Sequence, residues 1–244
     1  MSRIFLILNI ISHPNAKKYN SLIASYNLIF ADMITIKSFT NNPYQENTYI
    51  LYDETQTCVI IDPGMYTGAE QNNVVNFVKE HSLNPTLLLN THCHIDHVLG
   101  NKFIFDTYGL KPQLHKNELP VLEAIPSYAP QQGFEYELSP SPEIFLPDTG
   151  NINFGNSTLE IIYAPGHSPG HVCFYSKADV FLIGGDVLFY GSIGRTDLPG
   201  GNHNQLISSI KNNLMCLPDE VEVYAGHGKP TQIGYERLNN PFLN

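Results

Sequence analysis

Four side chains that can bind a metal ion occur within six consecutive residues of this chain, in the segment Thr91–His97. An apolar run, Leu87–Leu89, directly precedes them, which indicates that they follow the end of a buried strand. Imidazole and carboxylate together suit zinc, iron or manganese. So dense a polar cluster is too costly electrostatically to arise from packing alone. The segment therefore predicts a metal site. Its four candidates are His92, His94, Asp96 and His97.

The same arrangement, a polar side chain just past an apolar strand-like run, recurs along the chain. Runs rich in β-branched and aromatic residues that end at glycine or proline turns are typical of strands. Strand ends that open onto a common edge are where α/β folds gather catalytic groups. We therefore expect these side chains to converge with the histidine cluster. They are Asp62, His167, Asp186 and His227, after strands predicted over Cys58–Ile61, Thr158–Tyr163, Val180–Ile183 and Val221–Tyr224.

Predicted strands outnumber predicted helices, and some pairs of strands are joined by short connections. This pattern favours a mixed sheet sandwich with outer helices over one doubly wound parallel sheet. The other strands are expected over Ile34–Phe39, Thr48–Tyr52, Pro85–Asn90, Lys111–His115 and Val172–Tyr175, and the helices over Gly68–His81, Val98–Tyr108, His203–Leu214 and Gln232–Leu238.

Residues 118–150 are predicted to be the least regular part of the chain, because six prolines interrupt them. Long irregular segments in compact domains usually have a functional role. The segment is interpreted either as a surface insertion or as a lid over the substrate, and the sequence leaves both open.

The formal net charge of -10 argues against nucleic acid or an anionic membrane as the main partner, since both need a basic surface. No run approaches the roughly 20 apolar residues of a membrane span. The chain has four cysteines and no CxxC pair, and Cys58 and Cys173 lie in strand-like runs. Reduced, packed thiols are typical of a reducing compartment, so we expect a cytoplasmic protein.

The first 32 residues are expected to be an extension outside the core, because a strand pattern begins immediately after Met33. A single domain is then expected over residues 33–244. A short apolar stretch, Ile4–Ile11, follows Arg3 and resembles the apolar part of a signal peptide, but no clean cleavage site follows. The alternative is therefore an export or anchoring segment.

Two metal subsites follow more naturally from the cluster than one. His92 and His94 are two residues apart, so at a strand end their side chains lie on one side and can share an ion. Asp96 and His97 are adjacent and do not easily join the same ion. The further ligands must come from the later strand ends.

These motifs, in this order and spacing, resemble the metallo-β-lactamase fold superfamily over roughly residues 33–238. The resemblance implies an α/β fold, an αββα four-layer sandwich with the active site at one edge of the two sheets. It implies His92, His94 and His167 on a first metal, Asp96, His97 and His227 on a second, Asp186 bridging both, and Asp62 and His171 around these ligands. Asp96 and Asp186 would position the nucleophile through the metals.

Two further segments, Gly191–Asn202 and Gly234–Phe242, resemble the compact glyoxalase II-like branch of that superfamily. This resemblance implies hydrolysis of small-molecule thioesters such as S-lactoylglutathione, with two divalent cations, of which zinc is expected and iron or manganese would also serve. Two cations that share a water lower its pKa to about 7, so a hydroxide nucleophile exists at neutral pH. Longer members bind glutathione through basic residues of a C-terminal helical domain, and because only 17 residues follow His227, we do not expect glutathione to be recognised in that way.

Several alternatives remain. A persulfide dioxygenase of the same branch would hold one iron through His92, His167 and Asp186 or a near variant of that set. A non-catalytic metal-binding module would not explain the complete second ligand set, and the loops match a β-lactamase less well. Cys93 alternates with the two ligands beside it and is interpreted as a packing residue. Arg195 is a candidate for a substrate carboxylate, unless it pairs with Asp197. The oligomeric state stays open.

Overall fold

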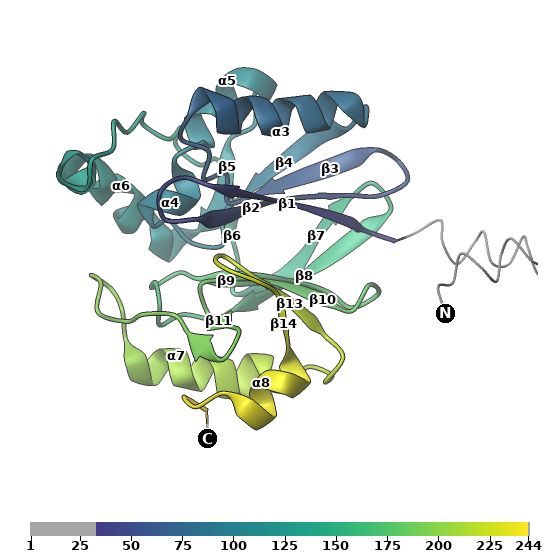
Figure 1. Cartoon of the computed structure of the whole chain (residues 1–244), viewed down its shortest axis with the longest axis vertical. Coiled ribbons are helices and arrows are strands. Elements are labelled where there is room, and N and C mark those ends of the chain that lie inside the picture. The colour runs from purple at the N-terminus through teal and green to yellow at the C-terminus, as the bar shows by residue number, and fades with distance from the viewer. Residues whose placement is uncertain (1–32, 244) are drawn as a thin grey trace, which may run out of the picture. The chain divides into compact units, whose positions relative to one another are not determined.

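The computed structural model describes residues 33–243, and the extension predicted over residues 1–32 lies outside them. Two six-stranded sheets carry the fold (Figure 1). The first sheet contains, in this order, β1 Thr35–Asn41, β2 Glu46–Tyr52, β3 Thr57–Ile61, β4 Asn84–Leu89, β5 Pro112–His115 and β6 Phe145–Leu146. Its strands are antiparallel from β1 to β3 and parallel from β3 to β6.

The second sheet has the order β14-β13-β10-β9-β8-β7. Its strands are β7 Thr149–Phe154, β8 Ser157–Tyr163, β9 Val172–Ser176, β10 Phe181–Gly185, β13 Glu222–Ala225 and β14 Thr231–Gln232. Only β10 and β13 pair in parallel. A short hairpin, β11 Leu188–Phe189 with β12 Ser192–Ile193, follows β10. Both sheets are therefore mixed or largely antiparallel, as the short connections predicted.

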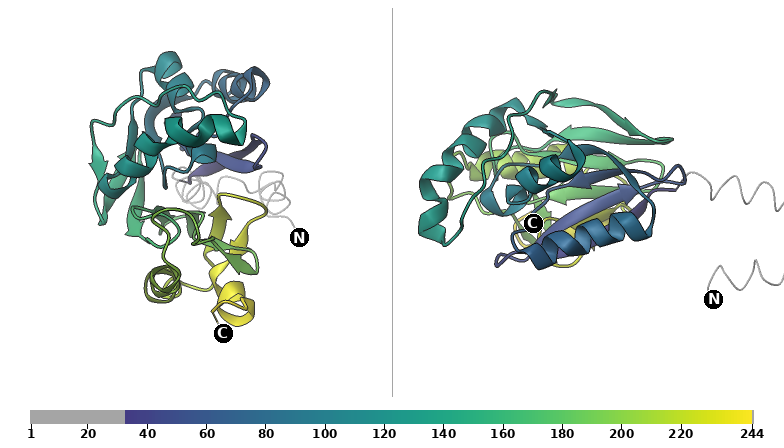
Figure 2. Two further views of the ribbon diagram at one scale, coloured as in Figure 1. Left: turned by 90° about the vertical axis from the view of Figure 1, so that its left-hand side faces the viewer. Right: turned by 90° about the horizontal axis from the view of Figure 1, so that it is seen from above.

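Helices cover the outer face of each sheet, and Figure 2 shows the two helical layers on opposite sides of the paired sheets. On the first sheet lie α3 Gly68–Glu80 and α5 Asn101–Tyr108, with α4 Ile95–Val98 and α6 Leu119–Tyr128 beside them. On the second lie α7 His203–Ser209, which continues as a π-turn over Ile210–Leu214, and α8 Ile233–Asn239. The predicted αββα four-layer sandwich is confirmed. Among the described residues, no helix has the length and apolar character that a bilayer span requires.

Alternation along the strands explains why the sheets are covered on both faces. In β2, Leu51 packs between the two sheets, whereas its neighbour Ile50 packs against the helical layer of α3 and α5. In β3, Val59 and Ile61 face inward and Ile60 faces outward. Successive side chains of a strand point to opposite faces, so two apolar faces need two partners.

All four cysteines are free, which agrees with the prediction that they form no disulfides.

Two predictions about helices were wrong in detail. The helix predicted over Val98–Tyr108 is broken, because Gly100 lies against Pro63 and its N–H donates to the Pro63 carbonyl at 2.6 Å. Residues 118–150 are more regular than expected, since α6 and a 3-10 turn, Ala129–Gln132, lie within them. Pro120 occupies the first turn of α6, where a missing N–H costs nothing, and Pro126 lies within the helix on its exposed side.

Candidate metal centre

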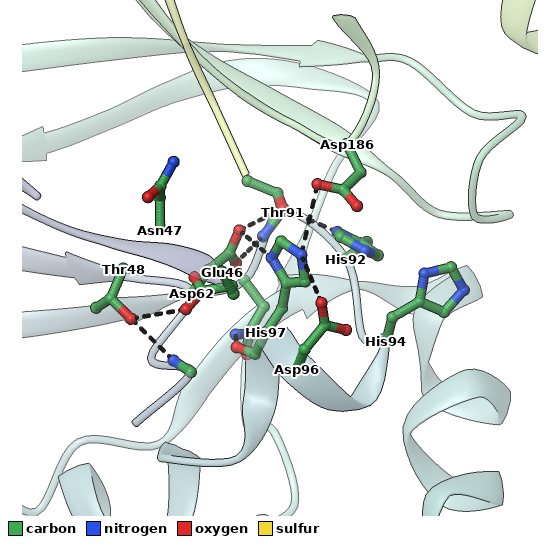
Figure 3. Close-up of polar contacts among 12 residues, drawn as sticks. Glu46, Asn47, Thr48, Asp62, Thr91, His92, His94, Asp96, His97 and Asp186 are labelled. Carbon is green, nitrogen blue, oxygen red and sulfur yellow. Dashed lines mark hydrogen bonds and ion pairs between the residues drawn. The ribbon is translucent and has the colours of Figure 1, made fainter. Parts of the chain in front are cut away.

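Strands of both sheets end at the same edge, and the residues after them form one cluster. His92 follows β4, His167 follows β8, Asp186 follows β10 and His227 follows β13. Figure 3 shows Asp96, His97 and Asp186 directed toward one another, with His92 beside them. All seven predicted ligands therefore meet, although they come from segments far apart in the chain.

The first group consists of His92, His94 and His167, whose nitrogens all lie within 4.8 Å of one another. Nε2 of His167 lies 3.3 Å from Nε2 of His92 and 2.9 Å from Nδ1 of His94. Three imidazole nitrogens that converge in this way can coordinate a single ion such as zinc.

The second group consists of Asp96, His97 and His227, again within 4.8 Å. Oδ2 of Asp96 lies 3.2 Å from Nε2 of His227 and 3.7 Å from Nε2 of His97. Adding a carboxylate to two imidazoles keeps this group suitable for zinc, iron or manganese. Asp96 and His97 thus group with His227, while His92 and His94 group with His167, and His92 also lies within 4.8 Å of donor atoms of Asp62 and His97.

Asp186 lies between the two groups. Its Oδ2 is 3.6 Å from Nε2 of His167 in the first group and 3.5 Å from Nε2 of His227 in the second. Its Oδ1 is 3.5 Å from Nε2 of His97. One carboxylate thus faces both groups, as a bridging ligand must.

Hydrogen bonds hold the rings with one nitrogen toward the site. The Nδ1 of His92 lies 3.1 Å from the Thr91 hydroxyl, that of His167 lies 2.8 Å from the Arg195 carbonyl, and that of His227 lies 3.0 Å from the Tyr44 carbonyl. A ring that donates from Nδ1 has its lone pair on Nε2, where a metal binds. These partners therefore select the tautomer that a cation requires.

Asp62 performs the same role for His97. Its Oδ2 lies 3.1 Å from Nδ1 of His97, and its carboxylate accepts from the N–H and hydroxyl of Thr91 at 2.7 and 2.6 Å. Asp62 has a φ of 49°, in the left-handed region that aspartate tolerates better than most residues. Asp62 therefore lies behind His97, on the side of the ring away from Asp96 and Asp186.

The electrostatics separate the two groups. Burial, and then the neighbouring imidazoles, hold the pKa of His92 well below its ordinary value, and the pKa of His94 falls to about 3. Burial also opposes protonation of His97 and His227, but Asp186 and Asp96 outweigh it and raise both pKa values, that of His227 to about 10. The surroundings thus disfavour protonation of the first group and favour positive charge in the second.

Two buried polar atoms in the cluster lack a hydrogen-bond partner within residues 33–243, as expected of atoms that bind a cation. Nε2 of His97 and Oδ1 of Asp186 are buried without a hydrogen-bond partner among the described residues. Such orphaned atoms are costly unless something binds them. Gly226 keeps the space beside them open, since a Cβ there would collide with Asp186 Oδ1 and His97 Cε1. The donor set and the orphaned atoms both suit cations.

A model of the metallo-beta-lactamase superfamily matches residues 41–227, a span that contains every predicted ligand. This chain belongs to the metallo-beta-lactamase superfamily. Within it, the chain is 38% identical over 204 residues to the probable metallo-hydrolase YqgX of Bacillus subtilis, covering 83% of this chain and 94% of that protein. It is 36% identical over 208 residues to the hydroxyacylglutathione hydrolase GloC of Haemophilus influenzae, covering 82% of this chain and 94% of that protein.

Solved structures of the superfamily agree with this assignment. The BLEG-1 B3 metallo-beta-lactamase superposes with a TM-score of 0.79 at 35% identity, covering 86% of this chain and all 100% of that one. TTHA1623 in a di-iron-bound form superposes with a TM-score of 0.76 at 36% identity, covering 85% and 100%. These relatives support a metal-dependent hydrolase, and the di-iron neighbour shows that iron occurs in a similar protein.

The remaining predicted residues of this superfamily member lie near the ligands without joining them. Nε2 of His171 accepts from the N–H of Asp186 at 3.0 Å, and its ring stacks on His92 with a centroid distance of 4.9 Å. The Arg195 side chain is exposed and binds Asp197 through two hydrogen bonds of 2.7 Å. The ion pair considered for Arg195 is therefore present, while its carbonyl supports His167.

Sequence reasoning missed Glu118, which is fully buried beside the first group. Its Oε2 accepts from the N–H of Cys93 at 2.8 Å, and its Oε1 accepts from the Ser168 hydroxyl and the Gly170 N–H, both at 2.6 Å. One carboxylate thus ties the segment between His92 and His94 to the segment after His167. Glu118 also lies just past a strand, β5, which is the signal that located the other site residues.

Cys93 is buried in an apolar cluster with Ile95, Val98 and α6 residues. Burial, followed by the nearby Glu118, raises the pKa of its thiol well above the ordinary value. The prediction that Cys93 packs rather than attacks substrate agrees with both observations.

An open cleft of about 1550 Å³ leads to the ligands. His94, Asp96, Asp186 and His227 line its floor, α6 forms part of one side, and the β11–β12 hairpin contributes to another. The cleft is large enough for a small-molecule substrate.

Proposed function

We propose that this protein is a dinuclear metal-dependent hydrolase that cleaves small-molecule thioesters, S-lactoylglutathione among them. The observation that carries the proposal is the position of Asp186, within 3.6 Å of a ligand nitrogen in each of the two groups. A carboxylate in this position could serve both cations, so that both would act on one substrate. His92, His94 and His167 would hold the first cation, and Asp96, His97 and His227 the second.

When bound, the two cations would supply a nucleophile from water at neutral pH and polarise the substrate carbonyl. The chain itself would hold the ligands in place. Asp62 and Thr91 fix the rings of His97 and His92, and His171 fixes the backbone of Asp186. No serine or cysteine nucleophile is needed, and the buried thiol of Cys93 has no access to the cleft floor.

The thioester part of the proposal is supported by the leaving group and by a relative. A thiolate leaves without much protonation, which suits a site whose floor is lined by metal ligands rather than by a free general acid. The hydroxyacylglutathione hydrolase GloC aligns over 94% of its own length. The four free cysteines suit the reducing cytoplasm, where we propose that the protein acts, with zinc as the expected metal.

Metal analysis combined with parallel assays tests the proposal. The purified protein should contain two metal equivalents and hydrolyse S-lactoylglutathione. Substitution Asp186→Asn removes the shared charge at constant size, so it should abolish hydrolysis and lower the metal content together. Asp106→Asn, in an exposed ion pair with Lys102 on α5, is the matched control and should change neither.

Two competing activities give different results. One iron per chain with oxygen uptake on glutathione persulfide would replace the proposal with a persulfide dioxygenase. Hydrolysis of a β-lactam without any thioester hydrolysis would replace it with the activity named for BLEG-1. A fully metallated and active Asp186→Asn variant would refute the bridging role.

A further inference from the structure

Helix α6 has two apolar faces, although a surface helix normally has one. Leu122 and Ile125 are buried and pack with Ala129 into the cluster around Cys93. A second set of side chains lines the cleft instead. We call it the α6 stripe: Pro120, Val121, Ala124 and Tyr128.

The α6 stripe is a single continuous surface. Its members are spaced one, three and four residues apart, which places them along one side of a helix. Pro120 and Ala124 are exposed, while Val121 and Tyr128 are half-buried. From Val121 to Tyr128 the stripe is about 10 Å long, at 1.5 Å per helical residue. The only other α6 residue that lines the cleft, Ser127, is uncharged.

The β11–β12 hairpin and the loop after it add apolar side chains to the same cleft. These are Phe189, Tyr190, Ile193 and Leu198. Tyr190 is 45% exposed, but its ring stacks on Tyr235 at a centroid distance of 4.9 Å and the Lys229 ammonium lies over it, so most of the apolar surface here comes from the other three.

The charged side chains that line the cleft are the candidate metal ligands at its floor and three basic residues. Apart from the ligand side chains, the charged residues that line the cleft are Lys116, Arg195 and Lys229. Arg195 is paired with Asp197, and the Lys229 ammonium lies 3.5 Å from the centre of the Tyr190 ring. None of the three interrupts the α6 stripe. The uncharged walls formed by α6 and the hairpin therefore belong to the same cleft as the candidate metal ligands. A substrate that reaches these ligands must lie against the uncharged walls.

We infer that the preferred substrate carries an extended apolar chain next to its scissile bond, rather than a short polar group such as lactoyl. This inference rests on the proposed thioester hydrolysis and adds its substrate class. Covering exposed apolar surface is favourable, and each added methylene is expected to raise kcat/KM by up to about fourfold until the stripe is covered. The chain can belong to the acyl group or to the thiol, and the experiment separates the two.

Two series of thioesters test the inference. In one, acetyl, butanoyl, hexanoyl and octanoyl groups are attached to the same thiol. In the other, the acetyl group is kept and the thiol carries an increasingly long alkyl chain. A rise in kcat/KM along either series is expected and identifies the side that contacts α6. Equal kcat/KM values along both series would overturn the inference, while hydrolysis of the short members would leave the proposed function standing.

A substitution in the α6 stripe tests whether the dependence of kcat/KM on chain length comes from contact with α6. Ala124→Asn introduces a polar amide at the middle of the stripe and should reduce kcat/KM for the longest substrate at least fivefold more than for the acetyl substrate. Glu123→Gln changes the neighbouring exposed residue, which does not line the cleft, and should leave the whole series unchanged. Equal losses on all substrates in Ala124→Asn would contradict the inference.

Binding separates this inference from failure of the proposed function. S-octylglutathione and S-methylglutathione are thioethers that cannot be hydrolysed, so calorimetry with the metal-loaded protein reports binding alone. Tighter binding of the octyl compound, weakened by Ala124→Asn, supports the apolar chain even if no thioester is turned over. Equal affinity for both compounds counts against an apolar chain on the acyl side, and the alkyl-thiol series then decides for the thiol side.

Discussion

Glu118 offers the sharpest test of how the first metal group is held together. Substitution Glu118→Gln keeps the size of the side chain and one oxygen. That oxygen can still accept from Ser168 and Gly170, at the 2.6 Å distances of the Glu118 Oε1 contacts. The other oxygen becomes an amide NH₂ that faces the N–H of Cys93, where Oε2 now accepts at 2.8 Å. The change therefore breaks the link on the His92–His94 side alone.

The expected size follows from burial. A buried N–H that loses its partner costs about 1–3 kcal/mol, and the facing amide offers no acceptor in exchange. Groups that orient metal ligands typically account for about 10- to 100-fold in metal affinity. We therefore expect the apoprotein of Glu118→Gln to lose about 1–3 kcal/mol of unfolding free energy, and the first metal group to bind about 10- to 100-fold more weakly.

The assay is metal content after dialysis against increasing chelator, together with denaturant unfolding of the apoprotein. One equivalent should leave the variant at a lower chelator concentration than in the unmodified protein, while the second is retained. Glu160→Gln, at an exposed position of β8, serves as the control for loss of a carboxylate. If Glu118→Gln released both equivalents at the same chelator concentration as the unmodified protein, the positioning role of Glu118 would be refuted.

Three further variants test other parts of the site. His227→Ala should remove about one metal equivalent and most hydrolysis, as measured by elemental analysis and initial rates; unimpaired turnover would favour a mononuclear mechanism. Cys93→Ala should retain hydrolysis and lose about 1 kcal/mol of unfolding free energy, because its thiol is buried packing; an inactive, fully metallated variant would make the thiol functional. Arg195→Ala should change the unfolding free energy by less than about 0.5 kcal/mol, because its pair with Asp197 is exposed, and a KM that rises several-fold would identify Arg195 as a substrate contact.

The sequence predicted most of the elements because their periodicity is local. The strands before Asp62, His92 and Asp186 are short apolar runs that end at polar turns, and the structure has strands there. The errors came from tertiary contacts. Gly100 ends a helix because it packs on Pro63, and α6 forms despite its prolines because Leu122 and Ile125 are buried. No local pattern reports such contacts.

The identity of the candidate ligands was likewise contained in the chain, since residue type and spacing limit which side chains can share an ion. The sequence also divided His92 and His94 from Asp96 and His97, because neighbouring side chains cannot all face one point. The resemblance implied that Asp186 bridges the two groups, and the tertiary structure supplied the distances from its carboxylate to each of them. Only the tertiary structure revealed the carboxylate of Glu118 and the uncovered α6 stripe. The physical reason is that these features depend on distances between segments far apart in the chain. Those distances are set by which strands pair and which side chains are buried, and no local sequence pattern specifies them.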